Sequence, residues 1–353
     1  MSDQINNKIN TIVLGSSGYV GGELLRLIAG HPQLELVAAV SASNAGKPIN
    51  SVFPHLQNAF GEQTFAGPDA VAAKLQGKVA IFSAAPHGAS AALVNDVLET
   101  AEKQGAEAHV VDVSADFRFA DADSYAAIYG THGAPQLLGD FMCALPEHAP
   151  NTDHPHVGHP GCFATAMLLA AVPLLQLDLV DGDLFATGVT GSTGSGQAPS
   201  AGTHHPVRHS NMYAYKPLSH RHAPEVQSIC EALTGKDNGL NFVPHSGPFA
   251  RGIHMTVQAK LKTAKSTDEL QKEFADFYNH NEFVKVVDGL PKLKNVTGSN
   301  YAHIGVAADG DSVAVFVVID NLIKGAAGGA VQWMNRKLGL DETTGLTTPG
   351  AGW

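Results

Sequence analysis

The residue with the clearest chemical potential is Cys162, which lies in the sequence His-Pro-Gly-Cys. Pro160 and Gly161 interrupt the chain directly before the apolar run FATAMLLAAVPLL, so the pattern predicts that the thiol lies at a helix N-terminus. Partial positive charge at that end favours the thiolate, which is the form of cysteine that attacks. We interpret Cys162 as a candidate nucleophile. The alternative, a small buried hydrophobic residue, suits Cys143 and Cys230.

A thiolate of this kind needs an acid or base, and the segment SHRHAPE supplies His220, His222 and Glu225. A histidine can hold a proton for a departing oxygen, and a carboxylate can fix the tautomer of that histidine. We expect one of the two histidines to be the acid/base and Glu225 its orienting partner. The segment taken alone also fits a solvated helix start.

A glycine pattern near the start of the chain indicates a nucleotide site. Gly15, Gly18 and Gly21 follow the apolar strand TIVL and precede the helical stretch GELLRLIAGH. The spacing is GxxGxxG, yet glycines still permit a tight turn, and a helix N-terminus presents free N–H groups to a pyrophosphate. The alternative is a glycine-rich turn without a ligand.

The end of the second predicted strand bears on which dinucleotide binds. An Asp or Glu there would bind the ribose hydroxyl of NAD, but LELVAAV runs into Ser41, Ala42, Ser43 and Asn44. Without a carboxylate to repel a 2′-phosphate, these serines and Lys47 favour NADP. Each serine is also an ordinary turn former.

Two patterns of secondary structure must position these residues. The first half alternates short apolar runs with helical stretches, which indicates βαβ units and a parallel sheet. After Cys162 the strands are longer and more polar, as in RGIHMTVQAKLK and DSVAVFVVIDNLIKG, which is typical of an antiparallel sheet with one solvated face. The stretch GAAGGAVQWMNRKLGL is helical by composition and could return to the first domain.

Composition narrows the class of protein. The chain has 353 residues, 44% of them hydrophobic, which allows two domains that share an active site. A net charge of −11 with scattered Lys and Arg gives no footprint for nucleic acid and favours a small charged metabolite. We find no signal-type start and no apolar run of roughly 18 residues, so we expect no membrane association. Three cysteines without CxxC spacing suit the reducing cytoplasm.

Eighteen histidines raise the question of a metal site. They include two clusters, one of His154, His156 and His159 and the other of His204, His205 and His209. No HExxH or CxxC frame accompanies them, and such runs often face solvent. We therefore predict no metal.

Taken together, the motifs resemble the N-acetyl-gamma-glutamyl-phosphate reductases of arginine biosynthesis over nearly the whole chain. The matching segments are GSSGYVGGELLRLIAGHP, VSADFRF, LPE at 145–147, HPGCFATA, HRHAPE, FVPH, RGI and IDNLIKGAAG. The resemblance implies an α/β fold: a Rossmann-type, doubly wound parallel sheet plus an α+β catalytic domain with a mainly antiparallel sheet. We expect residues 1–160 and 324–353 to form the dinucleotide-binding domain, and 161–323 the catalytic and oligomerisation domain.

The resemblance also implies NADPH as hydride donor, an acyl-phosphate substrate, inorganic phosphate as product and a homo-oligomer, usually a tetramer. Cys162 would be the nucleophile and His220 the acid/base. The implied cofactor contacts are Gly15, Ser17, Gly18, Tyr19 and Val20 at the pyrophosphate, Ser41 and Ser43 at the adenosine phosphate, and Pro86 and Asn321 beside the nicotinamide. The implied anion holders are Ser114, Arg118 and Arg251, because arginine suits bidentate binding of phosphate and carboxylate. Both arginines could instead form structural ion pairs.

Departures from the family pattern leave the acyl group open. The chain has PGCFATA where PGCYPTA is usual, GSGQ ending at Gln197 where an arginine is usual, ALPE for GLPE, and Gly329 where Gln is expected. A different N-acyl cap or an aminoadipyl analogue is an alternative, since one methylene gives only about 1–3 kcal/mol of discrimination. Further alternatives are an aspartate-semialdehyde dehydrogenase and an NADP-binding protein without catalysis.

Overall fold

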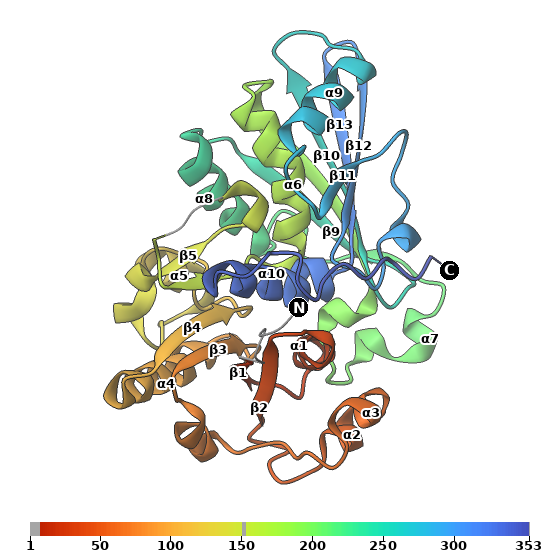
Figure 1. The fold of residues 1–353 in the computed structure, drawn as a ribbon. Coiled ribbons are helices and arrows are strands. Elements are labelled where there is room, and N and C mark those ends of the chain that lie inside the picture. Colours follow the sequence, from red (N-terminus) through yellow and green to blue (C-terminus); the bar gives the residue numbers. More distant parts are fainter. Residues whose placement is uncertain (1–7, 150–152, 353) are drawn as a thin grey trace, which may run out of the picture. The chain divides into compact units, whose positions relative to one another are not determined.

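The computed structural model describes residues 8–149 and 153–352, which form two compact units (Figure 1). Unit 1 comprises the described residues of 1–143, 151–159 and 327–347. Unit 2 comprises those of 144–150, 160–326 and 348–353.

Unit 1 contains a six-stranded parallel sheet in the order β2-β1-β3-β4-β6-β5. Its strands are β1 (Ile9–Leu14), β2 (Leu34–Val40), β3 (Lys78–Ser83), β4 (Glu107–Asp112), β5 (Phe141–Cys143) and β6 (His156–Gly158). The central strands are apolar nearly throughout, because helices cover both faces of such a sheet. The predicted doubly wound sheet is confirmed.

The helices of unit 1 are α1 (Tyr19–Gly30), α2 (Ile49–Val52), α3 (Gln57–Phe60), α4 (Ser90–Gln104), α5 (Ala122–Tyr129) and α10 (Gly328–Lys337). The apolar stripe of α4 joins the strands in one core cluster that includes Ile81 and Val94. The helix α10 packs against β4 and α1, so the predicted return of the C-terminal helix to the first domain is confirmed.

Unit 2 contains a seven-stranded mixed sheet in the order β11-β12-β13-β10-β7-β9-β8. Its strands are β7 (Val180–Thr190), β8 (Tyr213–Ala214), β9 (Leu240–Ser246), β10 (Ile253–Leu261), β11 (Val284–Val286), β12 (Ala302–Asp309) and β13 (Ser312–Ile319). Antiparallel pairs predominate, and only β7 with β9 and β11 with β12 pair in parallel among the described strands. The expected mainly antiparallel sheet is therefore also confirmed.

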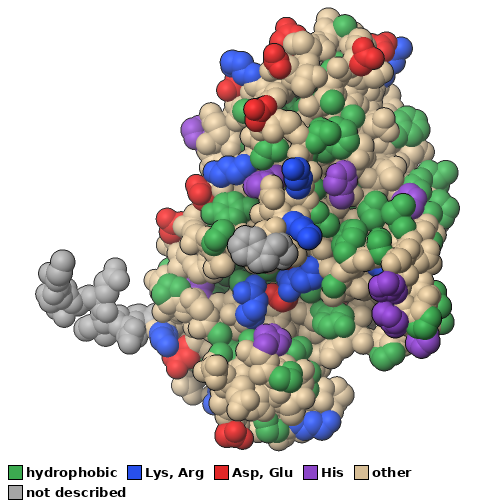
Figure 2. Space-filling view, turned by 90° about the vertical axis from the view of Figure 1, so that its right-hand side faces the viewer, with side chains coloured by type: hydrophobic (Ala, Val, Ile, Leu, Met, Phe, Trp, Pro, Cys, Tyr) green, Lys and Arg blue, Asp and Glu red, His purple; other side chains and the backbone are tan. Residues whose placement is uncertain are grey.

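Helices cover one face of this sheet. They are α6 (Cys162–Gln176), α8 (His222–Thr234) and α9 (Thr267–Phe277), while the short α7 (His205–Arg208) lies in the loop after β7. The helix α6 contacts β7, β10 and β13 and is buried from Phe163 to Leu175. Along each strand, every second side chain points away from these helices. Phe185 of β7 is one of them, and it is 56% exposed. The side of the molecule in Figure 2 shows exposed hydrophobic and histidine side chains.

Short helical turns complete the connections. The 3₁₀ turns are Pro54–Leu56, Pro68–Ala70, Ala72–Lys74, Pro135–Asp140, Pro146–His148, Ser192–Ser195, Ala201–Thr203 and Leu293–Asn295, and a π-helical turn spans Ile323–Ala327. No helix within residues 8–149 or 153–352 is long and apolar enough to cross a membrane.

The boundaries of the units differ from the expected domain boundaries at four places. Pro160 lies in unit 2. Residues 144–149 belong to unit 2 because Glu147 forms a buried ion pair with Lys324 of that unit. Residues 348–352 also belong there, since the N–H of Ala351 donates to the carbonyl of Thr297 at 2.9 Å. The last boundary lies at 327, within the π-helical turn, instead of at 324.

Candidate active site

The glycine-rich turn of unit 1 is built by close backbone contacts. Gly15 follows β1 with φ +66°, and a Cβ at this position would lie 2.5 Å from the Cα of Ala85. A Cβ at Gly21 would lie 2.4 Å from the carbonyl oxygen of Ser16. Both positions therefore require glycine, as the sequence pattern predicted.

This turn lies where a dinucleotide binds in parallel sheets. The strand β1 has β2 on one side and β3 on the other, which places a topological switch point at the carboxyl ends of β1 and β3. Gly18 is the N-cap of α1 and has no side chain to bond the N–H groups of the first turn. Tyr19 and Val20 begin the helix, and the exposed Pro86 follows β3. The backbone here fits an anion such as a pyrophosphate.

The serines predicted to face the adenosine phosphate lie together. The hydroxyl of Ser41 donates to the hydroxyl of Ser17 at 2.9 Å and lies 3.5 Å from that of Ser43. Next in the chain, Lys47 donates to the side-chain oxygen of Asn44 at 3.2 Å. The end of β2 thus presents hydroxyls and an ammonium group.

A cavity of about 350 Å³ begins beside these strand ends. Its apolar wall includes Leu14 and Val40 at the ends of β1 and β2, and Val97 of α4. Asp69, Asp96 and Thr100 supply its polar groups. The cavity is apolar enough to hold a flat ring and polar enough at its rim to bond amino groups of that ring.

Two of the predicted anion holders are engaged inside unit 1. Arg118 is 6% exposed, and its guanidinium donates to the carbonyls of His159 and Val113, both at 3.0 Å. The hydroxyl of Ser114 donates to the carboxylate of Asp112 at 2.6 Å. Burial raises the pKa of Asp112 to about 6, although hydrogen bonds from Ser114 oppose the shift. These contacts are structural, and binding of substrate by Ser114 and Arg118 stays a prediction.

Gly329, where the family pattern has Gln, lies against the buried ring of His159. A Cβ at Gly329 would lie 2.0 Å from Nε2 of His159, which is 1% exposed. The imidazole therefore occupies the space that a side chain at position 329 would need.

In unit 2, Cys162 is the first residue of α6 and is half-buried. Gly161 is the N-cap in an extended conformation, and the first turn of the helix contains no acidic residue. The predicted position at a helix N-terminus is confirmed, and the helix dipole favours the thiolate. Cys230, in contrast, is 4% exposed, and burial raises the pKa of its thiol to about 12. Cys143 lies in β5 of unit 1.

Glu225 holds the turn that precedes the cysteine. Its side chain is buried, and Oε1 accepts a hydrogen bond from the N–H of Gly161 at 2.7 Å. The contact thus joins α8 to the N-terminus of α6. The predicted effect of Glu225 on the tautomer of His220 stays a prediction.

His220 lies among aromatic rings near the cysteine. Its ring is 5.7 Å from that of Phe163, which follows Cys162, and 5.7 Å from that of Tyr215. Burial raises the pKa of Tyr215, and the charge of Cys162 contributes to the rise. Burial, with smaller contributions from the charges of Arg221 and Lys216, lowers the pKa of His220 to about 4. The imidazole is therefore neutral near pH 7. Its Nδ1 lies 3.2 Å from the N–H of His222, which donates to it.

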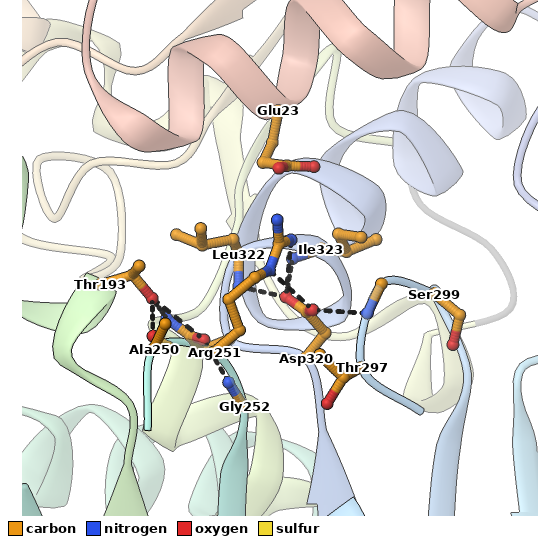
Figure 3. A network of polar contacts seen from close by, with 12 residues as sticks. Glu23, Thr193, Ala250, Arg251, Gly252, Thr297, Ser299, Asp320, Leu322 and Ile323 are labelled. Atoms are coloured by element: carbon orange, nitrogen blue, oxygen red, sulfur yellow. Dashed lines mark hydrogen bonds and ion pairs between the residues drawn. The ribbon is translucent and has the colours of Figure 1, made fainter. Parts of the chain in front are cut away.

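Arg251 is held by Asp320 (Figure 3). Its Nε and one terminal nitrogen each lie 3.1 Å from a carboxylate oxygen of Asp320, whose side chain is fully buried. The side chain of Arg251 as a whole retains 26% exposure. The structural ion pair that the sequence left open for Arg251 is thus present, and contact with a substrate anion stays a prediction.

Asn321 is fixed by neighbouring loops. Its Oδ1 accepts from the N–H of Gly252 at 2.7 Å, and its Nδ2 donates to the hydroxyl of Thr193 at 3.0 Å. The same hydroxyl donates to the carbonyl of Ala250 at 2.6 Å. The amide of Asn321 therefore has one orientation, which a residue beside a nicotinamide requires.

Comparisons with known proteins agree with this geometry. The family model described as "Semialdehyde dehydrogenase, NAD binding domain" matches residues 10–154, and "Semialdehyde dehydrogenase, dimerisation domain" matches 162–321. An N-acetyl-gamma-glutamyl-phosphate reductase of Methanopyrus kandleri is 40% identical over 96% of this chain and 98% of its own length. A reductase of the same name from Ectopseudomonas mendocina is 41% identical over 95% of this chain and 97% of its own length.

The chain belongs to the N-acetyl-gamma-glutamyl-phosphate reductase family. It is thus an oxidoreductase of the semialdehyde dehydrogenase type with a domain for a nicotinamide dinucleotide. Solved structures share the fold: aspartate semialdehyde dehydrogenase II of Vibrio cholerae has a TM-score of 0.69 at 15% identity and covers 94% of this chain and 98% of its own. An aspartate semialdehyde dehydrogenase with NADP from Candida albicans has a TM-score of 0.64 at 16% identity with the same coverage.

The structure of this reductase family member adds residues that sequence analysis did not assign. They are Thr193, Tyr215, Asp320, Lys324 and Glu147. The last three lie in IDNLIKGAAG and LPE, so the motifs were a signal, but their partners are distant in sequence. No group of three or more His, Cys, Asp or Glu in the described part of the chain is arranged to hold a metal ion.

Proposed function

We propose that this enzyme reduces N-acetyl-gamma-glutamyl phosphate with NADPH to N-acetylglutamate 5-semialdehyde and phosphate, as a step of arginine biosynthesis. The observation that carries the proposal is the half-buried Cys162 at the start of α6, with the neutral His220 packed against Phe163, the next residue in the chain. The relatives that match nearly the whole chain bear this activity in their names.

The first half of the proposed reaction forms a thioester. The thiolate of Cys162, which the N-terminus of α6 favours, attacks the γ-carbonyl carbon. The bond from that carbon to the phosphate oxygen breaks, and the departing phosphate takes a proton from solvent. Glu225 and the α6 N-terminus keep the sulfur in place during this step.

The second half releases the aldehyde. When bound, NADPH would supply the hydride that reduces the thioester carbon. The Nε2–H of neutral His220 donates a hydrogen bond to the resulting oxyanion. Backbone N–H groups at the start of α6 also stabilise the oxyanion. The carbon–sulfur bond then breaks, and the sulfur leaves as the thiolate that began the reaction.

Several features support NADP as the dinucleotide. The hydroxyls of Ser17, Ser41 and Ser43, with Lys47 nearby, suit a 2′-phosphate. The turn from Gly15 to Val20 is the proposed pyrophosphate site, and the cavity beside Val40 is the proposed adenine site. Pro86 and Asn321 are proposed to flank the nicotinamide.

Arg251 is the proposed holder of a substrate anion, since its side chain is not fully buried. Ser114 and Arg118 are included in this role by the family resemblance alone. We also propose a tetramer, in which the uncovered face of the seven-stranded sheet joins two copies, in keeping with the family model's description as a dimerisation domain. A cytoplasmic location would keep the thiol of Cys162 reduced.

Replacement of Cys162 tests the covalent scheme. We expect Cys162→Ser to lower phosphate-dependent reduction of NADP by the semialdehyde at least about 10³-fold, while NADP binding is retained. Cys143→Ser, a cysteine of unit 1, is the control and should keep turnover. Retained turnover in Cys162→Ser would contradict the scheme.

The substrate is tested with the same assay. Acetylated, succinylated, aminoadipyl and aspartate semialdehydes are compared by kcat/KM. The N-acetylglutamate semialdehyde should be preferred. A preference for aspartate semialdehyde would reassign the enzyme, and turnover of none of them would favour a protein that binds NADP without catalysis.

A further inference from the structure

The π-helical turn Ile323–Ala327 lies directly against the proposed nucleophile. The N–H of Gly325 donates to the carbonyl of Asp320 at 3.0 Å, five residues earlier. A Cβ at Gly325 would lie 2.8 Å from the Cβ of Cys162 and 3.0 Å from its Cα. Since π-helical turns are rare and recur at functional sites, the backbone of this turn forms one wall of the cysteine's surroundings.

The side chain of Asp320 fixes the beginning of the turn (Figure 3). Its Oδ1 accepts from the N–H groups of Leu322 and Ile323, at 2.9 and 3.1 Å. Its Oδ2 accepts from the N–H of Gly298 at 2.7 Å and from Arg251. The turn therefore starts from a rigid point.

A buried ion pair fixes the middle of the turn. Nζ of Lys324 lies 2.5 Å from Oε1 of Glu147, and both side chains are 1% exposed. The ammonium also lies 5.7 Å from the centre of the Phe283 ring. Two apolar residues of similar volume often stabilise a fold as well as such a pair, so its presence is poorly explained by stability alone. An ion pair is directional, so it fixes the orientation of the two side chains, whereas apolar packing does not.

We propose that Lys324 and Glu147 are positioning residues for Cys162. Their ion pair holds the π-helical turn in the register that places Gly325 against the cysteine. The inference rests on the proposed role of Cys162 as nucleophile. When the pair is removed, the turn relaxes, the thiol is less confined, and the sulfur is aligned less often with the carbonyl carbon.

Two variants of the full-length enzyme test this. Lys324→Met leaves a buried carboxylate and is expected to destabilise the fold, so the double variant Lys324→Met with Glu147→Met removes both charges and keeps the volume. We expect the double variant to lower kcat at least tenfold and to change KM for the semialdehyde less than twofold. Iodoacetamide should label Cys162 at least threefold faster, because Gly325 no longer confines the thiol.

Controls separate positioning from loss of folding. The buried Cys230 reports unfolding in the same labelling experiment, so its rate should stay at the wild-type value. Lys272→Met removes an exposed ion pair with Asp276 and should change neither kcat nor labelling. The proposal is overturned if the double variant has wild-type kcat and Cys162 labelling, or if Cys162 and Cys230 are labelled faster together. Failure of the nucleophile assignment itself would appear separately, as turnover by Cys162→Ser.

Discussion

The turn from Gly15 to Val20 in unit 1 and the surroundings of Cys162 in unit 2 are built from different groups. In the turn, missing side chains allow backbone to approach backbone within a few ångströms. Around Cys162, buried charged side chains hold the backbone: Glu225 at Gly161, Asp320 at Leu322, and Lys324 with Glu147. A backbone site fails when atoms are added, whereas a site held by charges fails when a charge is removed.

Among the substitutions that test this comparison, we expect the largest effect from replacement of Asp320, which should lower the free energy of unfolding. Asp320→Asn keeps the shape but removes the charge paired with Arg251 and turns an amide group toward N–H donors. We expect the free energy of unfolding to fall by about 3 kcal/mol, measured by urea denaturation. The exposed Asp276→Asn serves as the matched control and should stay near wild type. Equal effects of the two substitutions would show that burial of the charge is irrelevant.

The second prediction concerns the affinity for NADP at the turn from Gly15 to Val20. Gly15→Ala adds one methyl group at φ +66°, where it meets Ala85. We expect the dissociation constant of NADP to rise about 100-fold, since strain and overpacking together cost roughly 3 kcal/mol. Calorimetric titration with NADP measures it. Gly30→Ala, at the end of the same helix with open space around its Cβ, should bind NADP as the wild type does. A wild-type dissociation constant for NADP in Gly15→Ala would show that the close approach of Gly15 to Ala85 is not needed for binding.

The smallest effect tests a neutral polar side chain in unit 1. The Nδ1 of His156 accepts from the N–H of Val110 at 3.3 Å, and burial, followed by the charges of His109 and Lys337, lowers the pKa of His156 to about 4. The unfolded chain binds a proton near pH 6.5, so this residue reduces stability as pH falls from 6.5 toward 4, by about 1.4 kcal/mol per pH unit within that window.

His156→Asn removes the titration and keeps an acceptor for Val110. Urea denaturation at pH 7 and pH 5 should show a smaller loss of stability on acidification than in the wild type, by about 1 to 2 kcal/mol. The exposed His55→Asn should keep the wild-type pH dependence. An unchanged pH dependence in His156→Asn would mean that His156 is charged in the fold or neutral in both states.

Sequence patterns predicted the local parts of this molecule well. The strands β1 to β4 follow from apolar runs, and the helix start at Cys162 follows from Pro160 and Gly161. The three-residue strands β5 and β6 are too short to give a periodic signal. The sequence placed Ser41 and Ser43 at the end of the second strand, but the hydrogen bond from Ser41 to Ser17 became visible only in the structure.

Sequence patterns could not predict the long-range contacts that hold unit 2 together. Arg251 and Asp320 are 69 residues apart, and Glu147 and Lys324 are 177 residues apart. Periodicity describes neighbours within one element, and a charged residue gives no sign of its distant partner. Family resemblance marked the motifs, and the structure shows the internal partner that the sequence left open for Arg251, while its contact with a substrate anion stays a prediction.

The contact of His159 with Gly329 limits how this enzyme can be redesigned toward a consensus. Introducing the family's glutamine at 329 alone would drive its first side-chain atom into the imidazole. The two positions must therefore be exchanged as a set, and a library that varies them separately would discard a combination that folds.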